Sequence, residues 1–156
     1  MLNKLYYWIC SCCSRSSYNN KYITSVDKLT WNDTIPFVAP IKGGHVIKVY
    51  DGDTITIASI LPYKESPIFR FSVRLAGIDS PEIRGKSDHE KKIAQDSKHA
   101  LETLLLNRTI ILKNIKNEKY GRILADVYLD NLHVNKWMLD NNYAVKYDGG
   151  KKQSWD

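Results

Sequence analysis

Apolar and polar residues alternate along much of the chain between residues 46 and 128, and this period of two predicts β-strands. Residues 46–50 and 54–57 each alternate as half-buried strands do, and an Asp-Gly pair between them is typical of a tight hairpin turn. The same pattern predicts three more strands, at residues 73–78, 109–112 and 123–128. The central part of the chain is therefore expected to be mainly β.

Apolar residues that recur every three or four positions predict two helices. From residue 90 to residue 106 this spacing predicts an amphipathic helix, and either Ser87 or Asp88 is suited to cap its N-terminus. A shorter helix is expected over residues 135–140. Just before it, residues 133–134 are expected to form a last short strand that closes the sheet.

Changes in composition along the chain indicate four segments. Residues 1–22 are read as a leader, 23–43 as a linker that packs partly on the domain, 44–148 as the folded domain and 149–156 as a short tail. Within the domain, residues 58–69 contain two prolines and are expected to form an exposed loop. With 156 residues and 43% hydrophobic content, one compact domain is the default, and we expect a monomer.

The leader holds all three cysteines of the chain, Cys10, Cys12 and Cys13, beside an apolar stretch at residues 5–10. That stretch is too short to span a bilayer and lacks the features of a signal peptide, so an intracellular location is favoured over secretion. Acylation of these cysteines would attach the protein to a membrane surface. A leader with unmodified thiols is the alternative, and both stay open.

Candidate chemistry begins at the end of the strand expected over residues 73–78. Arg74 shares a strand face with apolar neighbours, and a buried arginine needs a fixed anion nearby. Pro81 stiffens the turn that carries Asp79 and Glu82. A purely structural pair between Arg74 and Asp79 explains this segment equally well.

Two further clusters favour a chemical role. Asp51 and Asp53 lie on the hairpin turn, where one aspartate would be enough, and several carboxylates on neighbouring turns suit a hard divalent cation. A basic turn at residues 118–122 places Arg122 at the start of the next strand. Two arginines beside a carboxylate-bound cation suit phosphoryl chemistry, and the net charge of +6 favours a polyanionic partner.

The chain resembles the thermonuclease family, also called the staphylococcal or micrococcal nuclease family, through four motifs in the family's order. They are residues 51–54 (Asp-Gly-Asp-Thr), Arg74, residues 79–82 (Asp-Ser-Pro-Glu) and residues 119–122 (Lys-Tyr-Gly-Arg). The resemblance covers residues 44–148. It implies an α+β, mainly β fold, a five-stranded OB-type barrel with two packed helices, and a calcium-dependent phosphodiesterase that cuts DNA and RNA.

The resemblance also implies a role for each matching residue. Asp53 and Asp79 match the carboxylates that bind calcium, and Ser80 stands where the family uses a backbone carbonyl as a ligand. Asp51 matches a carboxylate that supports these ligands without binding the metal. Glu82 matches the general base for the attacking water.

The remaining matches concern the substrate, which the resemblance implies to be single- or double-stranded DNA and RNA. Arg74 and Arg122 match the two arginines that clamp the phosphate and stabilise the charge that develops on it. Three more residues match positions that contact the substrate: Lys119, Tyr120 and Tyr147.

One departure and one alternative accompany this interpretation. The third, C-terminal helix of the best-known member has no counterpart in residues 149–156, and residues 23–43 are expected to cover the surface it would occupy. The alternative function is a non-catalytic OB-type module that binds nucleic acid or a modified peptide, with the leader tethering it to a membrane. Such a module would not need the carboxylates and arginines, so hydrolysis is favoured.

Overall fold

The computed structural model describes residues 28–85, 87–150, 152, 154 and 155. By compactness the chain divides into one unit at residues 1–36 and a second at residues 37–156. In the first unit a 3-10 helix at Trp31–Asp33 follows Thr30, whose amide and hydroxyl both donate to the Asp33 carboxylate. The cysteine leader lies outside the described residues, so its acylation and the segment boundaries stay predictions.

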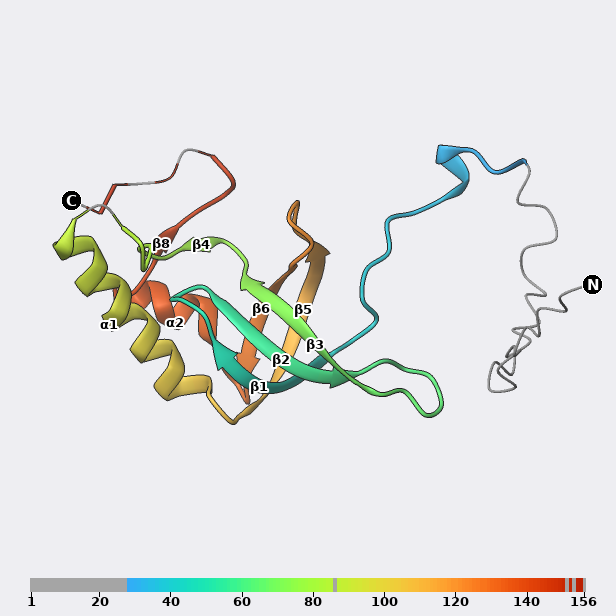
Figure 1. The fold of residues 1–156 in the computed structure, drawn as a ribbon, viewed down its shortest axis with the longest axis horizontal. Coiled ribbons are helices and arrows are strands. Elements are labelled where there is room, and N and C mark those ends of the chain that lie inside the picture. The colour runs from blue at the N-terminus through green and yellow to red at the C-terminus, as the bar shows by residue number, and fades with distance from the viewer. Residues whose placement is uncertain (1–27, 86, 151, 153, 156) are drawn as a thin grey trace, which may run out of the picture. The chain divides into compact units, whose positions relative to one another are not determined.

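Five strands close into a barrel in the second unit (Figure 1). They are β1 (Gly43–Val49), β2 (Thr54–Ile60), β3 (Ile68–Leu75), β5 (Thr109–Asn117) and β6 (Ile123–Leu129). Antiparallel pairing joins them in the order β3-β2-β1-β5-β6, and a parallel pairing of β3 with β6, with Val73 opposite Ile123, closes the ring. The predicted five-stranded, mainly β barrel with two helices is confirmed.

Three two-residue strands complete the pairing. β7 (Leu132–His133) forms a hairpin with β6, and β4 (Ile78–Asp79) pairs with β8 (Val145–Lys146). The prediction that residues 133–134 close the barrel is wrong, because β7 pairs with β6 and the chain turns into a helix at Val134. The end of β3 reaches β6 and makes the closure instead.

The two predicted helices are present and cover parts of the barrel (Figure 1). α1 (Asp88–Leu105) begins after Ser87, whose hydroxyl accepts a hydrogen bond from the Glu90 amide at 3.0 Å, as an N-cap does. α2 (Val134–Asp140) follows β7 directly. The described residues after β8 contain no further helix. No helix in the described part of the chain is both long and apolar enough to cross a membrane.

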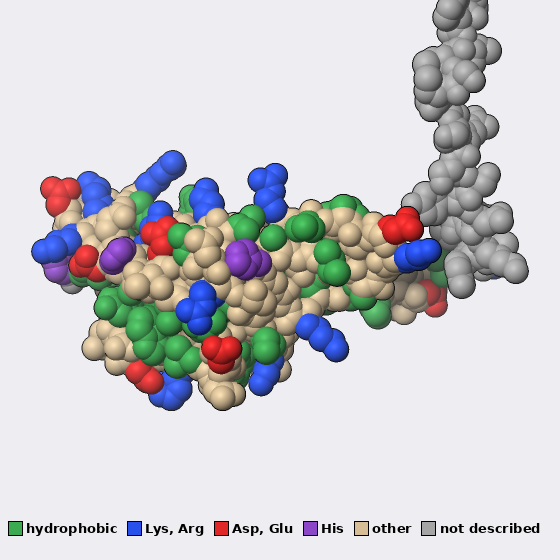
Figure 2. Space-filling model, turned by 90° about the horizontal axis from the view of Figure 1, so that it is seen from below, with side chains coloured by type: hydrophobic (Ala, Val, Ile, Leu, Met, Phe, Trp, Pro, Cys, Tyr) green, Lys and Arg blue, Asp and Glu red, His purple; other side chains and the backbone are tan. Residues whose placement is uncertain are grey.

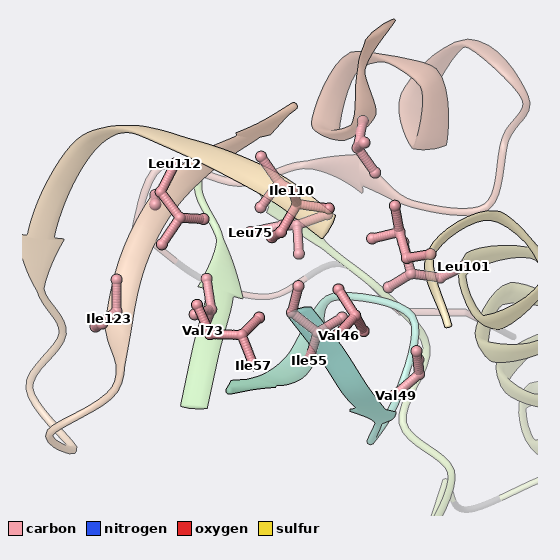
Figure 3. Packing of buried hydrophobic residues seen from close by; sticks show 14 of the residues in the cluster. Val46, Val49, Ile55, Ile57, Val73, Leu75, Leu101, Ile110, Leu112 and Ile123 are labelled. Carbon is pink, nitrogen blue, oxygen red and sulfur yellow. The ribbon is translucent and has the colours of Figure 1, made fainter. Parts of the chain in front are cut away.

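Alternate side chains of the five strands point into the barrel and form one apolar core (Figure 3). Val46, Ile57 and Val73 pack there with no exposed surface, and Leu101 joins them from α1. Ile41, two residues before β1, is also in this core with 5% of its surface exposed. The segment that leads into the barrel is therefore anchored by an aliphatic side chain.

The hairpin between β2 and β3 is more regular than its sequence indicates. Residues 58–69 were expected to form an exposed loop, but β2 continues to Ile60 and pairs there with Ile68 of β3. Only residues 61–67 are outside the ladder. The prediction is wrong at both ends, because Pro62 and Pro67 lie just beyond the paired residues and interrupt no strand.

Candidate functional site

The turn between β1 and β2 is pressed against α1 and the residue after β4, and Gly52 makes that approach feasible. A Cβ at this position would lie 2.8 Å from the Ser80 Cβ and would overlap the Ser97 hydroxyl of α1. The turn is held from within as well, since the Asp53 amide donates to Oδ1 of Asp51 at 3.1 Å. Asp53 is thereby held in place with 4% of its surface exposed.

The second element of the site is a sharp turn after β3. A single extended strand was expected through Ile78, but β3 ends at Leu75 and Gly77 adopts a φ of 75°. Asn135 of α2 holds this turn, because its side-chain amide donates to the Ala76 carbonyl at 2.9 Å. The predicted alternation of side chains is therefore broken here, and the chain folds back so that β4 approaches the end of β3.

Arg74 joins the two acidic turns. Its Nη2 donates to Oδ1 of Asp79 at 3.0 Å and to the Ile78 carbonyl at 3.2 Å, while Nη1 pairs with the carboxylate of Asp53. Burial lowers the pKa of Arg74, but the charges and hydrogen bonds of Asp53 and Asp79 outweigh it and raise that pKa above its ordinary value. The structural pairing of Arg74 with Asp79 is thus real, and it extends to Asp53.

Negative charge accumulates around Asp53. Burial, and next the charge of Asp53, raise the pKa of Asp51 to about 6. Oδ2 of Asp53 accepts a hydrogen bond from the Ser80 amide at 3.3 Å, and Oδ1 accepts one from the Thr54 hydroxyl at 2.8 Å. Because the charge of Asp53 opposes ionisation of Asp51, binding of a cation beside these two carboxylates would be favourable.

The oxygen atoms of this region fit a hard divalent cation by their chemistry. Arg74 pairs with the carboxylates of both Asp53 and Asp79, and the Ser80 amide donates a hydrogen bond to Asp53, so these three residues lie close together. Oxygen ligands of this kind suit calcium. Among the described residues no group of three or more Asp, Glu, His or Cys side chains is arranged to hold a metal. Any metal here would depend on two carboxylates completed by a backbone carbonyl and water.

Arg122 approaches from the turn between β5 and β6. Its Nε and Nη2 donate to the two carboxylate oxygens of Glu118, both at 3.1 Å, and Nη1 donates to the Thr54 hydroxyl at 3.4 Å. The hydrogen bonds from Arg122 are the main reason why the pKa of Glu118 lies below its ordinary value. Glu118 was not expected to take part in the site, and it holds the guanidinium of Arg122 beside Thr54 and Asp53.

These groups border one cavity of about 630 Å³. Nine of the ten predicted site residues line it: Asp51, Asp53, Arg74, Ser80, Glu82, Lys119, Tyr120, Arg122 and Tyr147. Asp79 lies behind the wall, with 2% of its surface exposed, and reaches the site through Arg74. The residues predicted from separate motifs are therefore brought together, although their roles stay predictions.

Aromatic rings with adjacent cations line the rim. The Tyr120 ring is 73% exposed and lies 4.8 Å from the Lys119 ammonium. The Tyr147 ring lies 5.8 Å from the Arg74 guanidinium, and the backbone amide of Tyr147 donates to the Gly77 carbonyl at 3.0 Å. Such rings can stack on nucleobases while the cations meet phosphates.

Several basic residues of the cavity were missed by the sequence interpretation. They are Lys48, Lys98 and Lys152, and Tyr50 beside Lys48 was missed as well. Lys48 and Tyr50 directly precede the acidic turn, so their position along the chain was a usable signal. Lys and Arg side chains are also spread over the face shown in Figure 2, so basic character by itself does not single out the cavity.

Known proteins share this sequence pattern. A family described as staphylococcal nuclease homologue matches residues 72–155, which is more than half of the chain. An uncharacterized protein of Methanocaldococcus jannaschii is 30% identical over 166 residues, covering 89% of this chain and 76% of that protein. An uncharacterized endonuclease of Escherichia coli is 30% identical over 106 residues, covering 67% of this chain and 61% of that protein.

A more distant match extends the comparison. A probable staphylococcal-like nuclease of Oryza sativa subsp. japonica is 27% identical over 75 residues, which cover 48% of this chain and 18% of that protein. The shared region is thus a minor part of the rice protein and a larger part of the microbial ones. The match over more than half of the chain, on a barrel that gathers the family's motif residues in one cavity, shows that this chain belongs to the staphylococcal nuclease homologue family.

Proposed function

We propose that the chain is a calcium-dependent endonuclease that hydrolyses phosphodiester bonds in DNA and RNA. The observation that supports this most is the convergence of Arg74, Arg122 and Glu82 on one cavity together with the acidic turns. A binding module would need a basic groove, but it would not need buried carboxylates beside two fixed guanidinium groups. Family membership and the relatives named as endonucleases support the same class of reaction.

In this proposal Asp53, Asp79 and the Ser80 carbonyl would hold the calcium ion. When bound, calcium supplies positive charge that polarises the phosphate and lowers the pKa of a water molecule. Glu82 lies on the cavity wall after the rigid Pro81 and accepts a proton from the attacking water.

The two arginines would bind the remaining phosphate oxygens. Their planar guanidinium groups are always charged and donate in pairs, which suits phosphate better than an ammonium group does. Glu118 keeps Arg122 in place, and Tyr120 and Tyr147 contact the neighbouring nucleotides. Removing one contact that stabilises charge in the transition state typically costs about 3 kcal/mol, or a hundredfold in rate.

The test is digestion of labelled single-stranded DNA, double-stranded DNA and RNA with calcium, repeated after addition of a chelator. We expect cleavage that requires calcium and is lost in Asp53→Asn. The matched control is Asp140→Asn, whose carboxylate pairs with Lys136 on the exposed side of α2. Chelator-insensitive cleavage would overturn the calcium requirement, and binding without cleavage would favour the non-catalytic module.

A further inference from the structure

The ammonium of Lys152 lies at the acidic end of the cavity. Its Nζ donates to Oε1 of Glu82 at 2.8 Å and lies 3.3 Å from Oδ1 of Asp79. Glu82 is 70 residues away along the chain, so this contact is not imposed by local geometry. The Glu82 side chain is 63% exposed. Burial lowers the pKa of Lys152, but the hydrogen bond to Glu82 and the charge of Asp79 raise it above its ordinary value overall.

This position conflicts with a bound metal ion. Calcium binds a carboxylate oxygen at about 2.3–2.6 Å. An ion held by Oδ1 of Asp79 would therefore lie within a few ångströms of an ammonium group that is 3.3 Å from the same oxygen. Like charges at that separation repel strongly in a partly buried site. Lys152 and the metal ion compete for the same carboxylate.

The charges around the cavity give Lys152 a role when no metal is bound. Asp53 and Asp79 are neutralised in part by Arg74, which pairs with both. Lys152 adds positive charge at Glu82 and at Oδ1 of Asp79, the same oxygen that Arg74 binds. The side chain is 49% exposed and the neighbouring residues 148–150 are exposed, so it can leave towards solvent without disturbing the core.

We propose that Lys152 is a tethered counter-cation that occupies the acidic end of the cavity in the metal-free protein and is displaced when calcium binds. The competition weakens calcium binding and couples it to displacement of the Lys152 side chain from Glu82 and Asp79. This inference rests on the proposed function, since it takes calcium as the metal and Asp79 as one of its ligands. It adds a residue of the chain that regulates the occupancy of that site.

The experiment measures calcium affinity by titration calorimetry on the full chain, with no substrate present. The variants are Lys152→Met, Lys152→Gln and the charge-preserving Lys152→Arg. The matched control is Lys146→Met, which removes one positive charge from the exposed edge of β8, six residues earlier and outside the cavity lining. Circular dichroism establishes that each variant is folded.

Loss of the Lys152 charge is expected to tighten calcium binding about fivefold to tenfold relative to Lys146→Met, as expected from two partly exposed ion pairs. Lys152→Arg is expected to stay close to the wild type. If Lys152→Met and Lys152→Gln bind calcium no more tightly than Lys146→Met does, the inference is overturned and the proposed function is left intact. Absence of calcium binding by every variant and by the wild type overturns the calcium site and this inference together.

Discussion

Arg74 and Asp79 form an ion pair with a hydrogen bond of 3.0 Å, although Arg74 is only 8% and Asp79 only 2% exposed. The pair joins the end of β3 to β4 across the turn at Gly77, and Arg74 extends it to the turn between β1 and β2 by pairing with Asp53. A group that we assign to phosphate binding is therefore also a structural link. Its loss should affect folding and catalysis together.

Replacement of Arg74 by alanine is predicted to lower both activity and stability. The nearly buried Asp53 would lose its cationic partner and Asp79 would keep only Lys152, and breaking a buried ion pair costs about 3–5 kcal/mol. Cleavage should fall about a hundredfold or more as a phosphate contact is lost. Arg122→Gln is the comparison, since the Arg122 side chain is 29% exposed. It should reduce cleavage similarly with a much smaller change in melting temperature. Equal melting temperatures for Arg74→Ala and wild type would contradict the structural link.

Gly52→Ala is predicted to destabilise the protein and to weaken calcium binding. The new Cβ would overlap the Ser97 hydroxyl, so the turn that carries Asp53 must move away from α1. Thermal unfolding and calcium titration measure the two effects. The double variant Gly52→Ala, Ser97→Gly removes the overlapping side chain and should regain part of both losses. A single variant that behaves as wild type would show that the turn does not need this approach.

The bond between Glu118 and Arg122 predicts a pH-dependent stability. The folded protein holds the pKa of Glu118 below its usual value near 4.5. The bond therefore stabilises the folded protein at any pH above 4.5, and this stabilisation is lost as the pH falls through the lower pKa that Glu118 has in the folded state. The melting temperature of Glu118→Gln should therefore lie below that of wild type at pH 7, and the difference should disappear once the pH is below the pKa of Glu118 in the folded protein. Glu65→Gln is the control, since Glu65 is 84% exposed. A difference that is independent of pH would contradict the assignment.

The segment before β1 is predicted to contribute stability through one side chain. Ile41 is 5% exposed within the core, whereas Phe37 is 74% exposed. Ile41→Ala should lower the free energy of unfolding by about 2–5 kcal/mol, whereas Phe37→Ala should change it by less than about 0.5 kcal/mol. Chemical denaturation measures both. The reverse order would mean that Phe37, and not Ile41, anchors this segment.

The elements that could be predicted from sequence depend on signals within a few residues. The Asp-Gly turn before Thr54, the Ser87 cap and the alternation in β5 and β6 are of this kind, and each is present in the structure. The extent of β2 and β3 was underestimated because Pro62 and Pro67 were read as breaks, although a proline just past a paired residue removes no ladder hydrogen bond.

The features that could not be predicted depend on contacts between distant segments. The parallel pairing of β3 with β6 joins residues about 50 positions apart along the chain, such as Val73 and Ile123, and no local motif signals it. Lys152 reaches Glu82 across 70 residues, and its neighbours in sequence give no sign of a site. The candidate site was recognised because its motifs have a family order. Glu118 is an exception among the missed features, because it lies only four residues before Arg122 and was overlooked in a turn that was interpreted by its basic residues.

We propose that the acidic turns and the two arginines act as one hydrolytic site with Glu82 as the base. The most direct test is the single-turnover rate of single-stranded DNA cleavage in calcium by Glu82→Gln, with Glu65→Gln as the control and substrate affinity measured separately. We predict a rate about a hundredfold or more below wild type for Glu82→Gln, with unchanged melting temperature and affinity, and a wild-type rate for the control. A wild-type cleavage rate for Glu82→Gln would contradict the claim.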